Sequence, residues 1–348
     1  MGVRSSRGSV LCSVVEIHEI DPHDEALTRT FWEIGKAADE VDRPWSTYWP
    51  WESARPAFTF PSTSMRKTLL AAFDGGRMVG SAEISFPLLD NRHSAYPEVF
   101  VHPQAQRHGA GTALLRASEA TVRDAGCRVL MAEVATPVEG PESAGMHFAR
   151  RHGFTIGIVD DIKVVELIET EPLWSALDSE TEGHLDGYRL EGWLDVCPKN
   201  LVEGYCRLME TFNSEAPMGE LELEPEHWDE GRLREKEERF RRSGRHEVST
   251  VAVAPDGTVA GVTEVLVSEH RPQLGLQGGT LVAKEHRGHR LGIAMKVFNH
   301  RAVRRAHPGC VHLLTGNADV NEAMNAVNDR LGYRTVERLA EMQKDLDG

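Results

Sequence analysis

The stretch QRHGAGTALL, residues 106–115, places two glycines one residue apart at the junction of two different patterns. The preceding residues, AYPEVFVHP (95–103), favour a β-strand, and the residues that follow, up to position 126, favour a helix. The first N–H groups of a helix have no partner within it, and the helix dipole favours an anion there. This junction is therefore typical of a phosphate-binding loop, with a helix start and incidental glycines as the alternative.

A second stretch, RGHRLGIAMK (287–296), repeats the first as part of a longer duplication. FDGGRMVGSAEISF (73–86) matches APDGTVAGVTEVLV (254–267), and each has the turn and alternating apolar residues of a β-hairpin. Val101 corresponds to Val282 and Gly111 to Gly292, at the same offset of 181 residues as the hairpins. The period is too long for a solenoid and predicts two copies of one globular domain.

Each copy predicts the same order of elements. A helix (27–41 or 199–213) precedes the hairpin and a third strand (95–102 or 277–284), and the glycine loop, a helix and a buried strand follow. A strand–helix–strand unit requires parallel strands. A last helix ends at Gly-Phe or Gly-Tyr, and we expect a final strand or hairpin to close each copy. The expected fold is α/β, with two tandem domains that each contain a mixed β-sheet. The predicted boundaries are a disordered lead-in (1–13), an N-terminal domain (14–168), an acidic linker broken by Pro and Gly (169–187) and a C-terminal domain (188–348).

Bulk composition excludes several classes of function. The chain has 348 residues and a net charge of −15, which argues against broad nucleic-acid binding. It has no apolar run of 18 residues, so we expect no membrane partner. Its five cysteines form no C-x-x-C pair and its histidines no H-x-x-x-H pair, so neither a disulfide framework nor a metal site is expected. We expect a cytoplasmic protein, either a monomer or a homodimer.

The glycine loop fits neither of two familiar nucleotide-binding patterns. It lacks the G-x-x-x-x-G-K-[ST] spacing, and Leu114 fills the third glycine position of G-x-G-x-x-G. The longer stretch VHPQAQRHGAG (101–111) instead resembles the acetyl-coenzyme A loop of the GNAT superfamily of N-acetyltransferases. Gln106, Gly109 and Gly111 hold the signature positions. This resemblance covers both copies and implies that each domain is a twisted mixed β-sheet flanked by helices, with acetyl-CoA bound where two parallel strands splay apart.

The resemblance implies a set of cofactor-binding residues in each copy. In the first copy these are Val101, Gln106, Arg107, His108, Gly109, Ala110, Gly111 and Thr112, and in the second they are Val282, Arg287, Gly288, His289, Arg290, Gly292 and Asn321. The second copy also resembles bacterial tandem GNAT proteins in TLVAKEHRGHRLGIAMK and TGNADVNEAMNAVNDRLGY. It departs from the pattern at Arg290, which replaces a glycine. Arg290 is tolerable if its backbone is helical; it could meet a phosphate or mark a copy that has lost the cofactor. Asn321 fits a family asparagine that holds pantetheine, or else caps a helix.

Four glutamates are candidates for the general base of amine acetylation. Glu133 in LMAEV is the leading one, because this stretch resembles the base-bearing strand of GNAT enzymes that acetylate ribosomal-protein N-termini. Glu98 and Glu83 are further candidates, and Glu264 is the candidate of the second copy, where LLTGN has no carboxylate. A glutamate on a solvated strand face is the alternative in each case.

Two further features bear on catalysis. The tyrosine that usually serves GNAT enzymes as general acid is replaced by Ala149 and Asn328, so another group must protonate the thiolate or activity is lost. The aromatic segment RPWSTYWPWESARPAFTFP (43–61) either shapes an acceptor site or packs onto the sheet, and packing is the favoured interpretation.

The resemblance implies an acetyl-CoA-dependent N-acetyltransferase that acts on the primary amine of a small molecule, with the first copy as the active one. An acyl-CoA-binding sensor or scaffold without transfer activity is the second hypothesis, and a protein or peptide acetyltransferase is the third.

Overall fold

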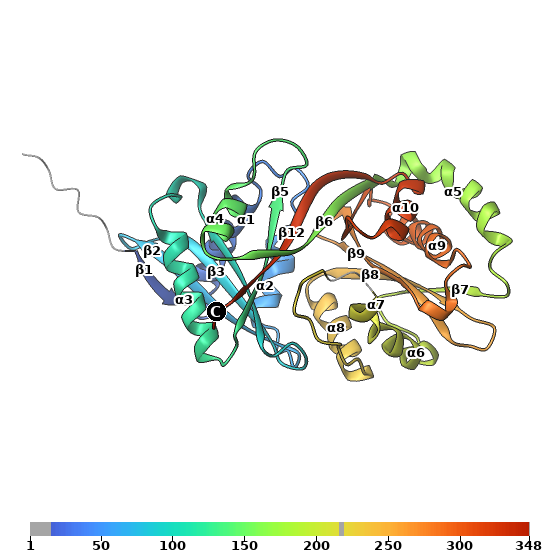
Figure 1. The fold of residues 1–348 in the computed structure, drawn as a ribbon, viewed down its shortest axis with the longest axis horizontal. Helices are drawn as coiled ribbons and strands as arrows, with labels where there is room; N and C mark the ends of the chain where they lie inside the picture. The colour runs from blue at the N-terminus through green and yellow to red at the C-terminus, as the bar shows by residue number, and fades with distance from the viewer. Residues whose placement is uncertain (1–14, 216–218, 348) are drawn as a thin grey trace, which may run out of the picture.

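The computed structural model describes residues 15–215 and 219–347, which fold around one twelve-stranded mixed sheet (Figure 1). The strand order is β1-β2-β3-β4-β5-β12-β6-β11-β10-β9-β8-β7. The predicted lead-in lies outside the described residues. The first half contains β1 (Glu16–Glu19), α1 (Glu25–Asp39), α2 (Trp51–Thr59), β2 (Met65–Asp74), β3 (Arg77–Pro87), β4 (Ser94–Val101), the 3-10 turn η1 (Pro103–Ala105), α3 (Ala110–Asp124), β5 (Val129–Thr136), α4 (Ala144–Arg151) and β6 (Thr155–Glu166).

The second half follows the same plan. It contains α5 (Leu167–Glu182), β7 (Arg189–Leu194), α6 (Lys199–Met209), α7 (Phe212–Glu215), α8 (Glu230–Arg242), β8 (Arg245–Val253), β9 (Val259–Ser268), β10 (Arg271–Val282), η2 (Lys284–His286), α9 (Leu291–Ala306), β11 (His312–Ala318), α10 (Glu322–Arg330) and β12 (Arg334–Asp345). β4, η1 and α3 correspond to β10, η2 and α9 at the predicted offset. β4 pairs parallel to β5 and β10 parallel to β11, so the predicted crossover is confirmed in both halves.

The matching glycines Gly80 and Gly261 are explained by close packing of a helix on the sheet. A Cβ at Gly80 would lie 2.8 Å from Leu114 Cδ1 in α3, and one at Gly261 would lie 2.8 Å from Met295 Cε in α9. Leu114 and Met295 are fully buried. A side chain at either glycine would therefore push the helix off the strand.

The last strand of each half pairs with the sheet of the other half. β6 pairs antiparallel with β11 from Asp160↔Ala318 to Glu166↔His312. β12 pairs antiparallel with β5 from Val129↔Asp345 to Thr136↔Arg338, and it also pairs with β6. Figure 1 shows β12 and β6 crossing side by side through the middle of the molecule. The expectation that each copy closes with its own final strand was wrong, because alternation along a strand fixes its faces and not its partner.

The acidic segment after β6 is helical rather than broken. Leu167–Glu182 forms α5, with Pro172 inside the helix, and it packs along α9. Trp174 and Leu177 are buried there, and Asp178 pairs with Arg301 at 2.5 Å. Burial of this apolar face against α9 stabilises the helix despite the Pro and the acidic composition.

Within residues 15–215 and 219–347, none of the helices combines the length and the apolar character that crossing a membrane requires.

Candidate active site

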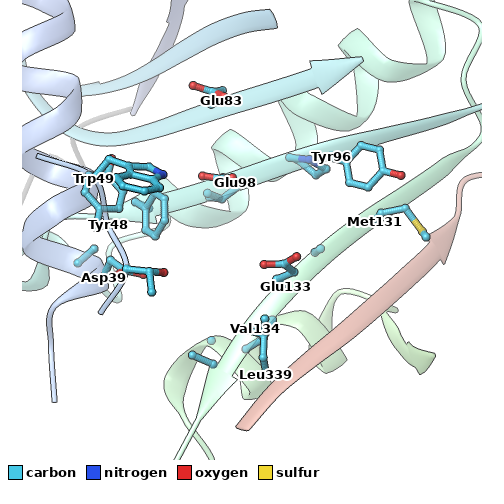
Figure 2. Close-up of a pocket in the computed structure, with 18 of the residues that line it drawn as sticks. Asp39, Tyr48, Trp49, Glu83, Tyr96, Glu98, Met131, Glu133, Val134 and Leu339 are labelled. Atoms are coloured by element: carbon cyan, nitrogen blue, oxygen red, sulfur yellow. The ribbon is translucent and has the colours of Figure 1, made fainter. Parts of the chain in front are cut away.

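A cleft of about 1790 Å³ lies between the two halves. Its walls come from β3, β4, β5, α4 and the 41–60 segment of the first half, and from α8, β8 and β12 of the second. Figure 2 shows Glu98 and Glu133 projecting into this space from neighbouring strands, with Tyr48 and Trp49 on one side. The exchange of final strands is what brings the second half to this site.

The cleft includes the point where β4 and β5 separate. The two parallel strands pair only at Ser94↔Val129 and Ala95↔Leu130. Glu98 and Glu133 lie beyond the last pair, where the strands have diverged and their facing backbone groups are not joined to each other. Such a splay gives an extended ligand room to pair with backbone amides, as in β-strand addition.

Glu98 and Glu133 are carboxylates without a partner. Neither forms an ion pair or a side-chain hydrogen bond with any described residue, and both are exposed to the water of the cleft. The surrounding walls nevertheless disfavour a negative charge, and together with the charge of Glu83 they raise the pKa of Glu98 to about 7. Desolvation also raises the pKa of Glu133, although Arg43 acts in the opposite direction.

β12 adds a carboxylate that the sequence did not indicate. Glu341 lies directly opposite Glu133 in the β5–β12 ladder, so both side chains are on one face of the sheet. Desolvation and the charges of Asp160 and Glu133 raise the pKa of Glu341 to about 7. Asp160 on β6 is part of the same group, and desolvation followed by the charge of Glu133 raises its pKa to about 6. Knowledge of the strand exchange would have been needed to find this group.

Glu83 is less available than the other carboxylates of the cleft. It lies opposite Glu98 in the β3–β4 ladder, but it accepts a hydrogen bond from Lys67 Nζ at 2.5 Å. Its charge is therefore already neutralised by a neighbouring strand.

The aromatic segment both packs and lines the cleft. Trp51 is buried at the start of α2, and Trp32 donates a hydrogen bond from Nε1 to the Trp49 carbonyl at 2.9 Å. The Tyr48 ring packs edge-on against Phe100 at 5.7 Å. Tyr48 and Trp49 also line the cleft, so the two alternatives for this segment are combined in one structure.

The glycine loop of the first half presents an open helix N-terminus. Gly109 is the N-cap of α3 with φ +92°, and nothing lies within 4 Å of a Cβ placed there. Ala113 is the first residue of the helix whose N–H reaches a helical carbonyl, that of Gly109 at 3.0 Å. Gln106 Nε2 donates to the Val101 carbonyl at 3.3 Å and closes the turn. This loop fits an anionic group such as the diphosphate of coenzyme A.

Comparison with known proteins agrees with this geometry. Residues 27–154, which hold the loop and the cleft carboxylates of β3, β4 and β5, match the family model of the Acetyltransferase (GNAT) family. Enzymes of this family use acetyl-CoA as donor, and no curated protein matches the chain.

Solved structures extend the GNAT fold over both halves. A tandem GNAT protein from the clavulanic acid biosynthesis pathway, without AcCoA, is 24% identical with a TM-score of 0.78, over 96% of this chain and 99% of that one. A GCN5-related N-acetyltransferase from Sphaerobacter thermophilus is 13% identical with a TM-score of 0.64, over 95% and 96% of the two chains. A glucosamine N-acetyltransferase region of a fungal multi-domain β-N-acetylglucosaminidase is 13% identical with a TM-score of 0.63, over 95% of this chain and 38% of that one. At these identities the likeness concerns the fold.

The second GNAT-like loop has the same backbone but is occupied by acidic side chains. Arg290 caps α9 in a left-handed conformation with φ +55°, rather than the helical one that we considered. Arg287 Nε donates to the Val282 carbonyl at 3.2 Å, as Gln106 does to Val101. The charges of the loop are paired: Arg287 with Glu215, His289 with Asp186, and Arg290 with Glu180. These carboxylates take the place of a diphosphate, so the second loop fits coenzyme A less well than the first.

Glu264 is part of a buried ion cluster in the second half. It accepts hydrogen bonds from the Tyr205 hydroxyl at 2.6 Å and from Lys236 Nζ at 3.1 Å, and Lys236 also pairs with Glu247 at 2.9 Å. Glu264 is only 9% exposed. A carboxylate held in this way is not free to accept a proton from an incoming amine.

The positions of the missing tyrosines lie in the helices that follow β5 and β11. Ala149 is buried in α4, and Asn328 is buried in α10, where it bonds to Lys296 and Asn317. Asn321 caps α10 by accepting a hydrogen bond from the Met324 N–H at 3.2 Å, the alternative role considered for it. In the described part of the chain, no group of three or more His, Cys, Asp or Glu side chains could hold a metal ion.

Proposed function

We propose that the protein is an acetyl-CoA-dependent N-acetyltransferase that transfers the acetyl group directly to the primary amine of a small molecule. The active site is the cleft between the two halves, with the donor bound by the first half. The observation that carries this proposal is the pair of unpartnered carboxylates, Glu98 and Glu133, on either side of the splay between β4 and β5.

The first half holds the donor. The N–H groups at the start of α3, around Gly109 to Thr112, bind the diphosphate, and the facing edges of β4 and β5 bind the amides of the pantetheine arm. Acetyl-CoA supplies an acyl thioester when it is bound.

The carboxylates of the cleft prepare the amine. Glu133, Glu341 and Asp160 attract the ammonium form, and Glu98, whose pKa is near neutrality, takes its proton. The nitrogen then forms a bond to the acetyl carbon, and the carbon–sulfur bond breaks. The nitrogen loses one further proton as the amide forms, and the thiolate takes up one proton, so that coenzyme A leaves as the thiol. Tyr48 and Tyr96 line the cleft, and burial raises the pKa of both, so their hydroxyls stay protonated and can donate a hydrogen bond to the leaving sulfur.

A sensor or scaffold without transfer activity is the second candidate. The observation that favours it is the replacement of the usual tyrosine by Ala149 and Asn328. Thiol release from acetyl-CoA, measured against a panel of small amines and identified by mass spectrometry of the products, separates the two. Turnover that is lost in Glu98→Gln supports the enzyme. Acetyl-CoA binding by calorimetry, without turnover on any amine, supports the sensor.

A further inference from the structure

Two arginines of the cleft wall have side chains with neither an ion pair nor a hydrogen bond to any described residue. Of the five arginine and lysine side chains that line the cleft, three are engaged: Arg43 by Asp39 and Glu337, Lys67 by Glu83, and Arg66 by the Thr68 hydroxyl. The side chains of Arg239 and Arg245 form no ion pair or hydrogen bond with any described residue. Both come from the second half and face a cleft whose opposite wall belongs to the first.

Arg239 is held at the cleft by its helix. α8 packs against α2 (Figure 1), and Glu235 fixes it there by accepting hydrogen bonds from the Thr63 N–H and the Ser64 hydroxyl, both at 2.9 Å. Arg239 follows Glu235 by one turn and so lies on the same side of the helix. The carboxylate of Glu235 is occupied by the 62–64 segment and lies outside ion-pair distance of Arg239.

Arg245 is stacked at the junction of the two halves. Its guanidinium lies 4.6 Å from the Trp49 ring and 5.5 Å from the Phe240 ring. Its Nε is buried without a hydrogen-bond partner in the described chain. Ring contacts engage the faces of a guanidinium but leave the N–H groups along its edge free.

The two guanidinium groups also disfavour each other. Burial and the charge of Arg239 lower the pKa of Arg245 to about 10. A role limited to stacking would explain one arginine between aromatic rings. It does not explain a second arginine nearby when neither guanidinium has a carboxylate within ion-pair distance, in a chain whose net charge is −15.

The cleft thus has unpaired charges of opposite sign. Glu98, Glu133 and Glu341 form the acidic part, and the two arginines form the basic part. We propose that the acceptor carries, in addition to its amine, a distal oxyanion group, a carboxylate or a phosphate, which Arg239 and Arg245 bind. A guanidinium fork matches both groups through paired N–H donors. This inference rests on the proposed function, because it takes the amine to be the group acetylated near Glu98.

Matched acceptors test it. ω-Amino carboxylates of increasing length are compared with their carboxamides, and phosphoethanolamine with ethanolamine, by thiol release. We expect kcat/KM to be about tenfold or more higher for the anionic member of at least one pair, because the neutral member leaves a charged donor unpaired. The pair with the larger ratio distinguishes carboxylate from phosphate.

Variants of α8 identify the residue. Arg239→Gln should reduce the ratio of kcat/KM between the anionic and the neutral acceptor about tenfold, because KM for the anionic acceptor rises. The value of kcat and the kinetics of the neutral acceptor should be nearly unchanged. Arg239→Lys, which keeps the charge but not the fork, should restore part of the ratio. Arg241→Gln is the matched control, because Arg241 is an exposed residue of the same helix that pairs with Glu238. Neutral acceptors turned over as well as anionic ones, or a ratio that survives in Arg239→Gln, would overturn the inference and leave the acetyltransferase proposal intact.

A binding experiment decides the case in which no acceptor is turned over. Inorganic phosphate and acetate are titrated by calorimetry into the wild-type protein, Arg239→Gln and Arg241→Gln. Phosphate bound at the α3 loop contributes equally to all three, so the difference isolates the arginine pair. About tenfold weaker binding of either anion in Arg239→Gln alone supports the site even if the proposed function fails. Equal binding by the three proteins overturns it.

Discussion

Glu133 and Glu341 lie directly opposite each other on neighbouring strands, although one belongs to the first copy of the repeat and the other ends the second. Their side chains share the sheet face that lines the cleft. A site built on the first half is therefore completed by a strand from the second, and the two halves are unequal parts of one site. The second half therefore contributes to the site through β12, even though acidic side chains occupy its own loop.

Glu341→Gln should weaken binding of a cationic acceptor. Loss of one charge of the acidic group should raise KM for the amine by about tenfold while kcat changes only a few-fold, the size expected for one lost charged interaction. Steady-state kinetics with a primary amine at pH 7 measure both. Asp345→Asn is the control, since Asp345 is exposed on the same strand. A large fall in kcat with KM unchanged would contradict a binding role.

The raised pKa values of three cleft carboxylates predict how the stability of the protein depends on pH. Glu98 and Glu341, with pKa values of about 7, and Asp160, with a pKa of about 6, bind protons more tightly in the folded than in the unfolded chain. Their contribution is fully present below the unfolded pKa, near 4.5, and is lost as pH rises through 7. The acceptor-free protein should therefore lose stability between pH 5 and pH 8, and Glu98→Gln should flatten this decline. Urea unfolding across that range measures it. A steeper decline in the variant would contradict the assignment.

The α3 loop can be tested by adding charge. Gly109→Glu places a carboxylate and a side chain at a left-handed position in front of the helix N-terminus, and we expect acetyl-CoA affinity to fall by about 100-fold or more. Gly109→Ala separates backbone strain from charge and should lower affinity much less. Calorimetry on folded protein measures both. Arg290→Glu in the second loop should leave affinity nearly unchanged. A large loss of acetyl-CoA affinity in Arg290→Glu and little loss in Gly109→Glu would place the donor in the second half.

Much of the fold could be predicted because its signals are local. The glycine loop and each hairpin depend on a few neighbouring residues, and the repeat is recognised by comparing these short stretches. The structure confirms the crossover that they predicted. The exchange of β6 and β12 could not be predicted. Alternation along β6 and β12 determines which side chains face the core, but it does not specify which strand lies beside them.

The part of the candidate site that comes from the first half could be predicted from the sequence, and the part from the second half could not. Glu98 lies on the strand that leads into the loop motif, and Glu133 lies in the LMAEV stretch that resembles a base-bearing strand, so family patterns indicate both. Glu341, Arg239 and Arg245 reach the cleft only through the exchange and the docking of α8. Their sequence surroundings are those of ordinary strand and helix residues, and no local pattern separates them from solvated ones.

Glu264→Gln should affect stability more than catalysis. Lys236 would lose one of its two carboxylates, and the Tyr205 hydroxyl would keep only a neutral amide oxygen as acceptor, in a buried cluster. We expect a loss of about 1–3 kcal/mol in the free energy of unfolding, because a charged group is left less well paired. Turnover should change little. Denaturant unfolding and thiol release measure the two effects, and loss of turnover at unchanged stability would move the chemistry to the second half.

The ranking of Glu98 and Glu133 is the most direct test of the mechanism. If Glu98 is the base, Glu98→Gln should lower kcat by about 100-fold or more at unchanged acetyl-CoA affinity, and it should remove the rise of kcat/KM with pH that a group of pKa about 7 produces. Glu133→Gln should raise KM for the amine and keep that pH dependence. The sequence alone favoured Glu133, and the opposite pattern, with the pH limb lost in Glu133→Gln, would return the role to it. Both variants must first give the wild-type unfolding transition. A pH limb that persists in each single variant and disappears only in the double variant would mean that the two carboxylates share the proton.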